Sequence, residues 1–382
     1  MLSYWETQSF LKYNYIIIGS GITGLSTAIE LKEKFANKSI LILERGLLPT
    51  GASTKNAGFA CMGSVTELLD DLEHNSEEKV VELFELRKKG LEILRHRLSD
   101  SNINYMENGS YELISENEMS ATSKIEYLNC LLKHTSARQI FKLANHKIDD
   151  FGFSKKYIKA LIETSGEGEL DTGKMMKALL EKANKLGIEI KTGANVKEYT
   201  QLNNYVDVRI ENSFSNEDLI LKTENLILCT NAFTSQLLNV EDVKPGRGQV
   251  LITHPIENLK FKGTFHFDKG YYYFREIDGR ILLGGGRNLD FKTEETTEFN
   301  LNNFIQDELQ KKLKDIIIPG TKFTIDQKWS GIMAFGNAKF PIVKQFSNNV
   351  FGAFRLGGMG VALGSWVGKI ISELAAPDKL NG

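Results

Sequence analysis

The feature that most constrains the fold is a turn near the N-terminus with the spacing G-x-G-x-x-G, made by Gly19, Gly21 and Gly24. The β-branched run at residues 16–18 precedes this turn and is typical of a buried parallel strand. Residues 22–35 follow it with apolar side chains at helical spacing. In such a unit the first glycine permits the tight turn and the second lets a pyrophosphate approach the backbone. The third lets the helix lie close to the sheet, so the pattern predicts a dinucleotide site.

A second apolar run and a carboxylate complete this pattern. Residues 40–43 form the run, and Glu44 follows it, twenty positions after Gly24. A carboxylate at this place is expected to bind a ribose hydroxyl. The helix start, at Ile22 and Thr23, offers free N–H groups and a positive dipole end to phosphates. Strand, turn, helix, strand and acid together favour dinucleotide binding over a merely glycine-rich turn.

Length and composition place the chain in an ordinary globular class. Its 382 residues suffice for two domains, and 41% hydrophobic and 25% charged residues are typical of a folded protein. The formal net charge of −2 gives no basic field for nucleic acid or an anionic membrane. We see no signal peptide and no apolar run of transmembrane length, and we expect a cytoplasmic protein without a membrane span.

The cysteines give no sign of metal or redox chemistry. Cys61, Cys130 and Cys229 lie far apart, and no C-x-x-C pair occurs. We therefore predict no metal site, and a sparse, odd count fits a reducing compartment.

Local patterns between the motifs predict further elements. Residues 105–114 suggest a hairpin around Asn108-Gly109. Residues 116–149 contain no glycine or proline and are expected to be helical. Residues 249–285 contain several short strands, which suggest an antiparallel sheet. The turn at residues 229–231 follows a buried strand, where α/β sheets bind ligands.

Several motifs spread along the whole chain resemble one family in the order expected for it. They are IIIGSGITGL, the pair Glu44-Arg45, GASTKNAG and, near the C-terminus, GGMGVALG. The chain resembles the D-amino-acid oxidase and glycine/sarcosine oxidase family of FAD enzymes. The loop after Glu44 is rich in small and apolar residues, which suits a buried segment covering a flat cofactor.

The resemblance implies an α/β fold, α+β overall, with two domains. A Rossmann-like FAD-binding domain is expected from residues 1–65, 150–240 and 325–382. A discontinuous substrate domain, built on a mainly antiparallel sheet plus helices, is expected from residues 66–149 and 241–324.

The resemblance also implies the cofactor and its contacts. FAD is expected to bind without a covalent link, because the stretch matching the tethering cysteine of sarcosine-oxidase relatives has Ser330 and no cysteine. The backbone at Val196 is expected to contact adenine, and the C-terminal glycine turn to face the pyrimidine edge of the flavin. The implied cofactor residues are Gly19, Gly21, Ile22, Thr23, Gly24, Glu44, Arg45, Ser53, Lys55, Asn56, Ala57, Gly58, Val196, Cys229, Thr230, Asn231, Gly357, Gly358, Met359, Gly360, Val361 and Ala362.

The substrate side is less defined by the sequence. Tyr271, Tyr273 and Arg275 share one face of a strand by the two-residue period. Family members usually hold the substrate carboxylate with an arginine, and Met333 occupies the matching place. These four residues are the candidate substrate pocket.

The missing arginine leaves the carboxylate site open. Arg275, Arg287 and Lys55 are candidate replacements, or the substrate is an amine without a carboxylate. For Arg247 and Arg355, a structural ion pair explains the residue as well as a role in substrate binding does.

We expect an FAD-dependent oxidoreductase that oxidises the C–N bond of a small amine or amino acid by hydride transfer to flavin, with the imine then hydrolysed. No catalytic side chain is identified, since none of the histidines belongs to a motif. An NAD-dependent Rossmann dehydrogenase and an RNA-modifying flavin domain are the alternatives. The electron acceptor is undefined, and Leu282 occupies the place of a lysine that oxidase relatives carry near the flavin.

Overall fold

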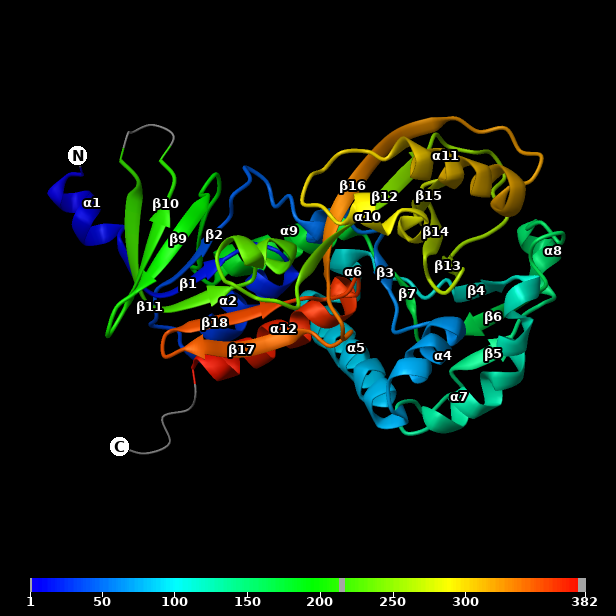
Figure 1. The fold of residues 1–382 in the computed structure, drawn as a ribbon, viewed down its shortest axis with the longest axis horizontal. Coiled ribbons are helices and arrows are strands. Elements are labelled where there is room, and N and C mark those ends of the chain that lie inside the picture. The colour runs from blue at the N-terminus through cyan, green and yellow to red at the C-terminus, as the bar shows by residue number, and fades with distance from the viewer. Residues whose placement is uncertain (1, 213–216, 377–382) are drawn as a thin grey trace.

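The computed structural model describes residues 2–212 and 217–376, which build two large sheets and the helices around them (Figure 1). The first sheet has the order β17-β18-β11-β1-β2-β8, and β9 and β10 extend it from β11. Its strands are β1 (Lys12–Ile18), β2 (Ile40–Leu43), β8 (Glu189–Lys191), β9 (Val196–Gln201), β10 (Val206–Ile210), β11 (Leu219–Leu228), β17 (Ile342–Ser347) and β18 (Val350–Phe354).

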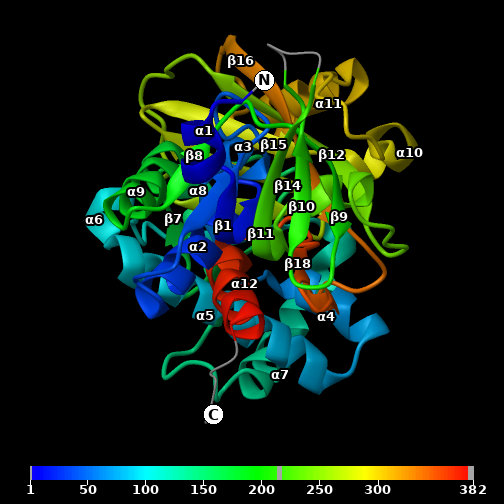
Figure 2. The ribbon, with the colours of Figure 1, turned by 90° about the vertical axis from the view of Figure 1, so that its left-hand side faces the viewer.

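The centre of the first sheet is parallel and buried on both faces. Ile16 of β1 lies between Leu41 of β2 and Leu226 of β11, and all three side chains are buried. The helices of this half are α1 (Tyr4–Ser9), α2 (Ile22–Lys34), α3 (Ala52–Lys55), α9 (Thr172–Lys185), η2 (Asn231–Gln236) and α12 (Gly360–Ala375). Figure 2 shows α2 and α12 side by side beneath the strands. Apolar runs without alternation produce such doubly covered strands.

The second sheet is mostly antiparallel and has the order β16-β12-β15-β14-β13-β4-β6-β5. Its β13 pairs with β4 in parallel. The strands are β4 (Ser110–Ile114), β5 (Phe141–Leu143), β6 (Ala160–Thr164), β12 (Lys244–Thr253), β13 (Thr264–Phe267), β14 (Tyr272–Ile277), β15 (Arg280–Gly285) and β16 (Ile325–Phe335). A small ribbon of β3 (Phe59–Ala60) and β7 (Gly168–Glu169) lies apart from both sheets.

Further helices pack on the second sheet, as α11 does on β12, and α5 packs on α12 of the first half. They are α4 (Val65–His74), α5 (Glu77–Leu98), α6 (Asp100–Ile103), η1 (Glu116–Lys124), α7 (Ile125–Leu131), α8 (Lys147–Phe151), η3 (Arg287–Leu289), α10 (Phe291–Glu294), α11 (Asn303–Lys312) and η4 (Leu313–Ile317). The outer face packs on a phenylalanine cluster in which Phe265 and Phe274 stack with ring centroids 4.7 Å apart.

The predicted fold class is confirmed, whereas two local predictions are wrong. Residues 105–109 form no strand of a hairpin; Met106 makes an isolated bridge to Glu169, and β4 pairs with β6 and β13. The stretch 116–149 is interrupted by β5, where Phe141 is buried opposite Thr164. Pairing with distant strands overrides local propensity at both places.

The predicted domain boundaries stay a prediction, and two strands bear on them. β6 and β16 belong to the second sheet, although they fall within residues 150–240 and 325–382 of the predicted nucleotide domain.

Within residues 2–212 and 217–376, no helix has the length and apolar character needed to cross a membrane.

Candidate active site

The glycine turn between β1 and α2 leaves no room for side chains at two positions. Gly19 has φ +104°, and a Cβ atom there would lie 2.7 Å from the carbonyl oxygen of Cys229. A Cβ atom at Gly24 would lie 1.9 Å from the carbonyl oxygen of Gly19. The start of α2 therefore lies directly against the carboxyl ends of β1 and β11, as a dinucleotide fold requires.

The segment around α3 packs on the start of α2. The Ile22 N–H donates a hydrogen bond to Ser53 Oγ at 3.0 Å, and a Cβ atom at Gly21 would lie 2.9 Å from the same oxygen. Thr23 faces α12 instead, since its Oγ1 is 3.5 Å from the place of a Cβ at Gly364. Only small groups, Gly21 and the Ser53 hydroxyl, thus lie at the positive end of α2, which suits a phosphate group.

Glu44 ties the end of β2 to the glycine turn. Its Oε2 accepts hydrogen bonds from the Ser20 N–H at 3.0 Å and the Ser20 hydroxyl at 2.7 Å. Its Oε1 accepts one from the Gly46 N–H at 3.1 Å. A carboxylate has about four acceptor sites, so Glu44 retains capacity for a ribose hydroxyl.

Arg45 lies beside a groove next to this carboxylate. Its guanidinium carbon is 3.6 Å from the centroid of the Phe233 ring, and burial lowers the pKa of Arg45. The groove has a volume of about 580 Å³. It is lined by Arg45, Gly46, Thr50, Asn195, Gln236 and Phe299. Val196, the predicted adenine contact, follows Asn195 at the start of β9.

The turn after β11 joins the neighbouring strand ends. Asn231 Oδ1 accepts hydrogen bonds from the N–H groups of Arg355 and Leu356, and Thr230 Oγ1 lies 2.9 Å from Thr234 Oγ1. Burial raises the pKa of the Cys229 thiol to about 12, so Cys229 is a packing residue and not a thiolate nucleophile.

The second glycine turn leads into α12, whose start lies beside the start of α2. Gly357 and Gly358 have φ values of +57° and +83°, and α12 begins at Gly360. A Cβ atom at Gly364 would lie 2.7 Å from Ile22 Cγ2, and Ser26 Oγ is 3.3 Å from Ser365 Oγ.

Residues of α2 and α12 therefore contact one another in the same order along both helices, and the two helices are parallel (Figure 2). Their positive ends lie at the same end of the helix pair. Met359 is the N-cap of α12, and Val361 and Ala362 are buried in its first turn.

One face of the second sheet carries a row of glycines with side chains laid over them. Register places Gly246, Gly248 and Gly284 on the same face as Met333. A Cβ atom at Gly284 would lie 2.5 Å from the ring of Tyr273, and one at Gly248 would lie 2.9 Å from Met333 Cε. The Met333 sulfur is in turn 3.5 Å from the place of a Cβ at Gly358, so this face meets the C-terminal glycine turn.

Two of the predicted pocket residues, Tyr273 and Met333, lie on this face, and Tyr271 directly precedes β14. Burial raises the pKa of Tyr273 to about 12, so its hydroxyl stays protonated at neutral pH. Tyr271 is 36% exposed and its ring meets that of Phe291 edge to face with centroids 6.0 Å apart. Met333 is half-buried between β12 and the glycine turn.

Arg275, the fourth predicted pocket residue, is engaged elsewhere. It is 5% exposed, and its Nη1 donates to the carbonyl oxygens of Leu170 at 2.8 Å, Gly58 at 3.2 Å and Ala57 at 3.3 Å. Glu169 lies 3.7 Å from its Nε. This guanidinium fixes β14 to the segment after α3, so we do not propose it as a substrate ligand.

Asn56 and Lys55 also hold this segment in place. Asn56 Oδ1 accepts from the Gly58 N–H at 2.9 Å and the Thr172 hydroxyl at 2.8 Å. Lys55 Cβ is 3.2 Å from the place of a Cβ at Gly331 on β16. The Trp329 indole N–H donates to the Lys55 carbonyl oxygen at 3.0 Å.

The sequence analysis did not name His266 and Phe59, which lie beside Tyr273 on this face. His266 of β13 pairs with Tyr273 of β14, and its ring centroid is 5.0 Å from that of Phe59. Burial lowers the pKa of His266 to about 4, so the imidazole is uncharged at neutral pH. The two-residue period, continued across the antiparallel partner, is the signal that would have located His266.

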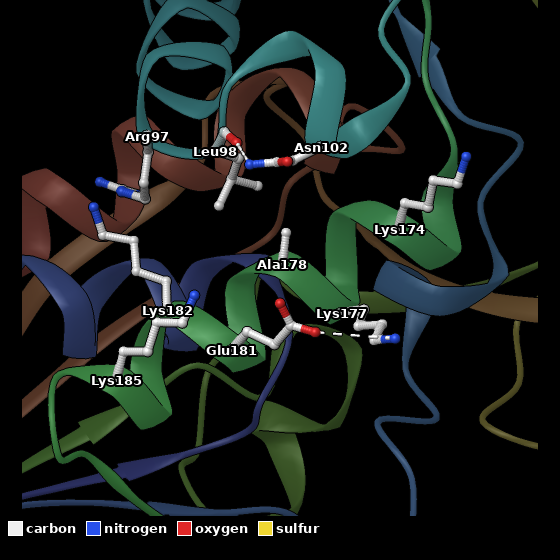
Figure 3. A pocket seen from close by; sticks show the side chains of 9 residues that line it. All are labelled: Arg97, Leu98, Asn102, Lys174, Lys177, Ala178, Glu181, Lys182 and Lys185. Atoms are coloured by element: carbon white, nitrogen blue, oxygen red, sulfur yellow. Dashed lines mark hydrogen bonds and ion pairs between the residues drawn. The ribbon is translucent and has the colours of Figure 1, made fainter.

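Another groove contains none of these residues. Figure 3 shows it between α9 and the ends of α5 and α6, with a volume of about 500 Å³. Its cations are mostly paired, as Arg97 with Glu30 and Lys182 with Glu33. These ion pairs account for the charges without a ligand, so we assign the groove no function.

The residues present fit FAD, and the individual contacts stay a prediction. The glycine turn, Glu44 and the paired starts of α2 and α12 form a bare, extended cradle in which a Cβ atom would clash. Cys61 and Cys229 are buried and Cys130 lies exposed on α7, so none is on β16. Non-covalent binding therefore stays a prediction, which acid precipitation tests by releasing the yellow colour. The described residues contain no metal-ligand cluster.

Comparison with known proteins points the same way. The family model described as FAD dependent oxidoreductase, DAO, matches residues 14–374. Probable oxidoreductase OrdL of Haemophilus influenzae is 22% identical over 377 residues, covering 95% of this chain and 82% of that protein.

Solved structures share the fold. L-proline dehydrogenase from P. horikoshii aligns with a TM-score of 0.76 at 18% identity, over 95% of this chain and 93% of that chain. Glycine oxidase from Bacillus cereus aligns with a TM-score of 0.75 at 18% identity, over 97% and 96%. At such identity the likeness is one of fold.

Proposed function

The chain belongs to the family of FAD-dependent oxidoreductases, and from this premise we propose that it oxidises the C–N bond of a small amine or amino acid. The product is an imine, which water hydrolyses. The observation that carries the proposal is the sheet face where Tyr273 and Met333 lie over glycines, with Met333 reaching the C-terminal glycine turn. The similar solved structures are named for glycine and L-proline, both amino acids.

The cofactor supplies, when bound, an acceptor for the hydride that leaves the carbon beside nitrogen. We propose that the residues of the glycine turns, Glu44, Arg45 and the segment after α3 hold it. The chain's remaining task is to orient the substrate and exclude water.

The pocket wall favours the uncharged form of the amine. Phe59 and Met333 offer apolar surface, and the His266 imidazole and the Tyr273 hydroxyl are both uncharged at neutral pH. A desolvated ammonium is costly, so the pocket favours the amine with its lone pair free. Tyr273 can donate its hydroxyl proton in a hydrogen bond and His266 can accept one at its unprotonated ring nitrogen.

The alternatives have less support. An NAD-dependent dehydrogenase does not fit the FAD-dependent family that the chain belongs to. An RNA-modifying role has little support, because the net charge of −2 gives no overall basic field.

The test is anaerobic mixing of the yellow protein with a panel of amino acids, primary amines and secondary amines. We expect at least one of them to bleach the flavin and to yield a carbonyl compound with free ammonia or amine. Bleaching by NADH or by hydroxy acids alone would contradict the proposal.

A further inference from the structure

Arg287 lies at the edge of the glycine-lined face, with its guanidinium over two aromatic rings. The guanidinium carbon is 3.8 Å from the ring centroid of Phe335 and 4.7 Å from that of Phe291. A Cβ atom at Gly246 would lie 3.2 Å from Arg287 Nη1, so the absence of a side chain there admits the guanidinium. Stacking on ring faces fixes the plane of the guanidinium and directs its N–H groups outward from that plane's edge.

This guanidinium has no hydrogen-bond acceptor or carboxylate partner among residues 2–212 and 217–376. The nearby carboxylates pair with other cations. Glu294 accepts hydrogen bonds from Arg247 Nε at 2.9 Å and Nη2 at 2.7 Å, and the Glu295 carboxylate is 3.6 Å from Lys244 Nζ. Burial lowers the pKa of Arg287, yet an arginine stays charged at any working pH. Glu294 and Glu295 act on Arg287 only from beyond ion-pair distance, and a half-buried cation without a close anionic partner is unusual because desolvation is costly.

The other arginines of the neighbouring strands show the contrast. Arg247 of β12 pairs with Glu294, and Arg280 of β15 pairs with Asp326. Arg275 of β14 donates hydrogen bonds to four backbone carbonyl oxygens. Their contacts are complete without a ligand. Arg287, by contrast, lies over two aromatic rings and has no acceptor for its N–H groups among residues 2–212 and 217–376.

Arg287 is also close to the residues of the candidate pocket. Gly246, against which it packs, pairs directly with Met333 across β12 and β16. Phe291, the second ring over Arg287, meets the ring of Tyr271 at 6.0 Å between centroids. The guanidinium therefore borders the wall formed by Tyr271 and Met333.

We propose that Arg287 binds the carboxylate of the substrate, so that the substrate class is an amino acid and not a simple amine. The planar fork of N–H donors matches a carboxylate in two parallel hydrogen bonds. This inference rests on the proposed function, because it concerns the substrate of that same pocket. In this proposal the carboxylate-binding cation lies in the turn after β15. It does not lie on β16, where Met333 occupies the place of the family's arginine.

Lys55 is the competing cation on this face. Its Nζ is 5.3 Å from the ring centroid of Phe299, and no acid of the described chain pairs with it. Lys55 packs its stem along Gly331, and an ammonium lacks the planar fork. The experiment separates the two cations.

The test uses matched acids and amides. Flavin reduction is measured without oxygen for the best amino acid and its carboxamide, in wild type, Arg287→Met, Arg287→Lys, Lys55→Met and Arg209→Met. Arg209 is an exposed control on β10, paired with Glu198 at 3.0 Å. We expect Arg287→Met to reduce the preference for acid over amide about 100-fold, since a charge-assisted pair of hydrogen bonds is lost. Arg287→Lys should restore part of the preference, and Arg209→Met should keep all of it.

A binding measurement without turnover accompanies this series. Benzoate and benzamide are similar in shape and differ in charge, and their dissociation constants are read from the flavin spectrum. Arg287→Met should weaken benzoate and leave benzamide unchanged. Equal retention of flavin and of melting temperature confirms that each variant is folded.

The outcomes separate this inference from the proposed function. If no amine or amino acid reduces the wild-type flavin, the proposed function fails. If amino acids reduce it and Arg287→Met retains the acid preference, the inference alone is overturned. Loss of that preference in Lys55→Met but not in Arg287→Met also overturns it, as does a wild type that prefers amines without a carboxylate.

Discussion

Ser53 Oγ lies 3.0 Å from the backbone nitrogen of Ile22, the first residue of α2. This contact joins the GASTKNAG motif to the glycine turn across thirty-one positions of sequence. It places small side chains around the positive end of the helix, so the bare cradle depends on both motifs together.

Replacing Gly21 by valine should abolish FAD binding. The new Cβ would lie 2.9 Å from Ser53 Oγ, and the branched side chain would fill the space above the start of α2. We expect colourless protein after desalting, measured as flavin released per chain. Gly173→Val at the start of α9, where the nearest atom to a Cβ is Asp171 Oδ1 at 3.3 Å, is the control and should stay yellow. Full flavin content in Gly21→Val would show that phosphates bind elsewhere.

The sequence was sufficient for the first half of this architecture because its signals are local. The βαβ unit with Gly19, Gly21, Gly24 and Glu44 combines periodicity, turn chemistry and spacing within one short stretch. The structure confirms the predicted fold class.

Long-range pairing explains what the sequence did not predict. β4 pairs in parallel with β13 through Ser110 and Thr264, and no local pattern specifies such a partner. The strand period predicts Arg275 as a pocket residue, and it does not predict that its guanidinium binds the carbonyl oxygens of the distant Gly58 and Leu170. Conversely, Arg287 stands out only once its neighbours' acceptors are known. Whether a cation is paired is a property of tertiary contacts and not of spacing.

Tyr273→Phe should alter turnover while leaving stability nearly unchanged. The ring would keep its packing over Gly284 and against Phe59, whose centroid is 5.6 Å away, and only the hydroxyl would be lost. We expect a several-fold change in flavin reduction and about 0.5 kcal/mol or less in stability. Tyr157→Phe, at a 37% exposed ring, is the control. If Tyr271→Phe and Tyr273→Phe both left turnover and apparent affinity unchanged, the pocket would lie elsewhere.

Two buried carboxyls should make the protein less stable as pH rises. Burial raises the pKa of Glu112 and of Glu167 from 4.5 to about 7. Between those values the folded state keeps protons that the unfolded state has lost, so stability present below pH 4.5 declines up to about pH 7. The contribution is at most about 3 kcal/mol for each group.

Glu112→Gln should flatten this dependence, measured as melting temperature between pH 4.5 and pH 7.5. The amide oxygen can still accept from the Ser64 hydroxyl, which is 2.8 Å from the Glu112 carboxylate. Glu82→Gln, at an exposed position, should leave the slope unchanged. An unchanged slope in Glu112→Gln would mean that this carboxyl is ionised in the folded protein.

Oxygen should be a poor electron acceptor for the reduced protein. Leu282 is 6% exposed and packs with Ala57 and Val250, where a lysine would offer positive charge to a developing superoxide. We propose a quinone, another flavoprotein or a carrier as the acceptor. The measurement is stopped-flow reoxidation in air-saturated buffer, with free reduced flavin as reference. Reoxidation about 100-fold faster than that reference, or roughly 2.7 kcal/mol of barrier lowering, would contradict the prediction.

The central claim is that hydride leaves the carbon bonded to nitrogen, and isotopic substitution at that carbon tests it most directly. The best substrate is prepared with deuterium on that carbon, and again with deuterium on a more distant one, and anaerobic flavin reduction is followed by stopped flow. We predict slower reduction only for deuterium beside nitrogen, together with release of that nitrogen as ammonia or amine. Reduction by the analogue in which oxygen replaces nitrogen, with none by any amine or amino acid, would contradict the account.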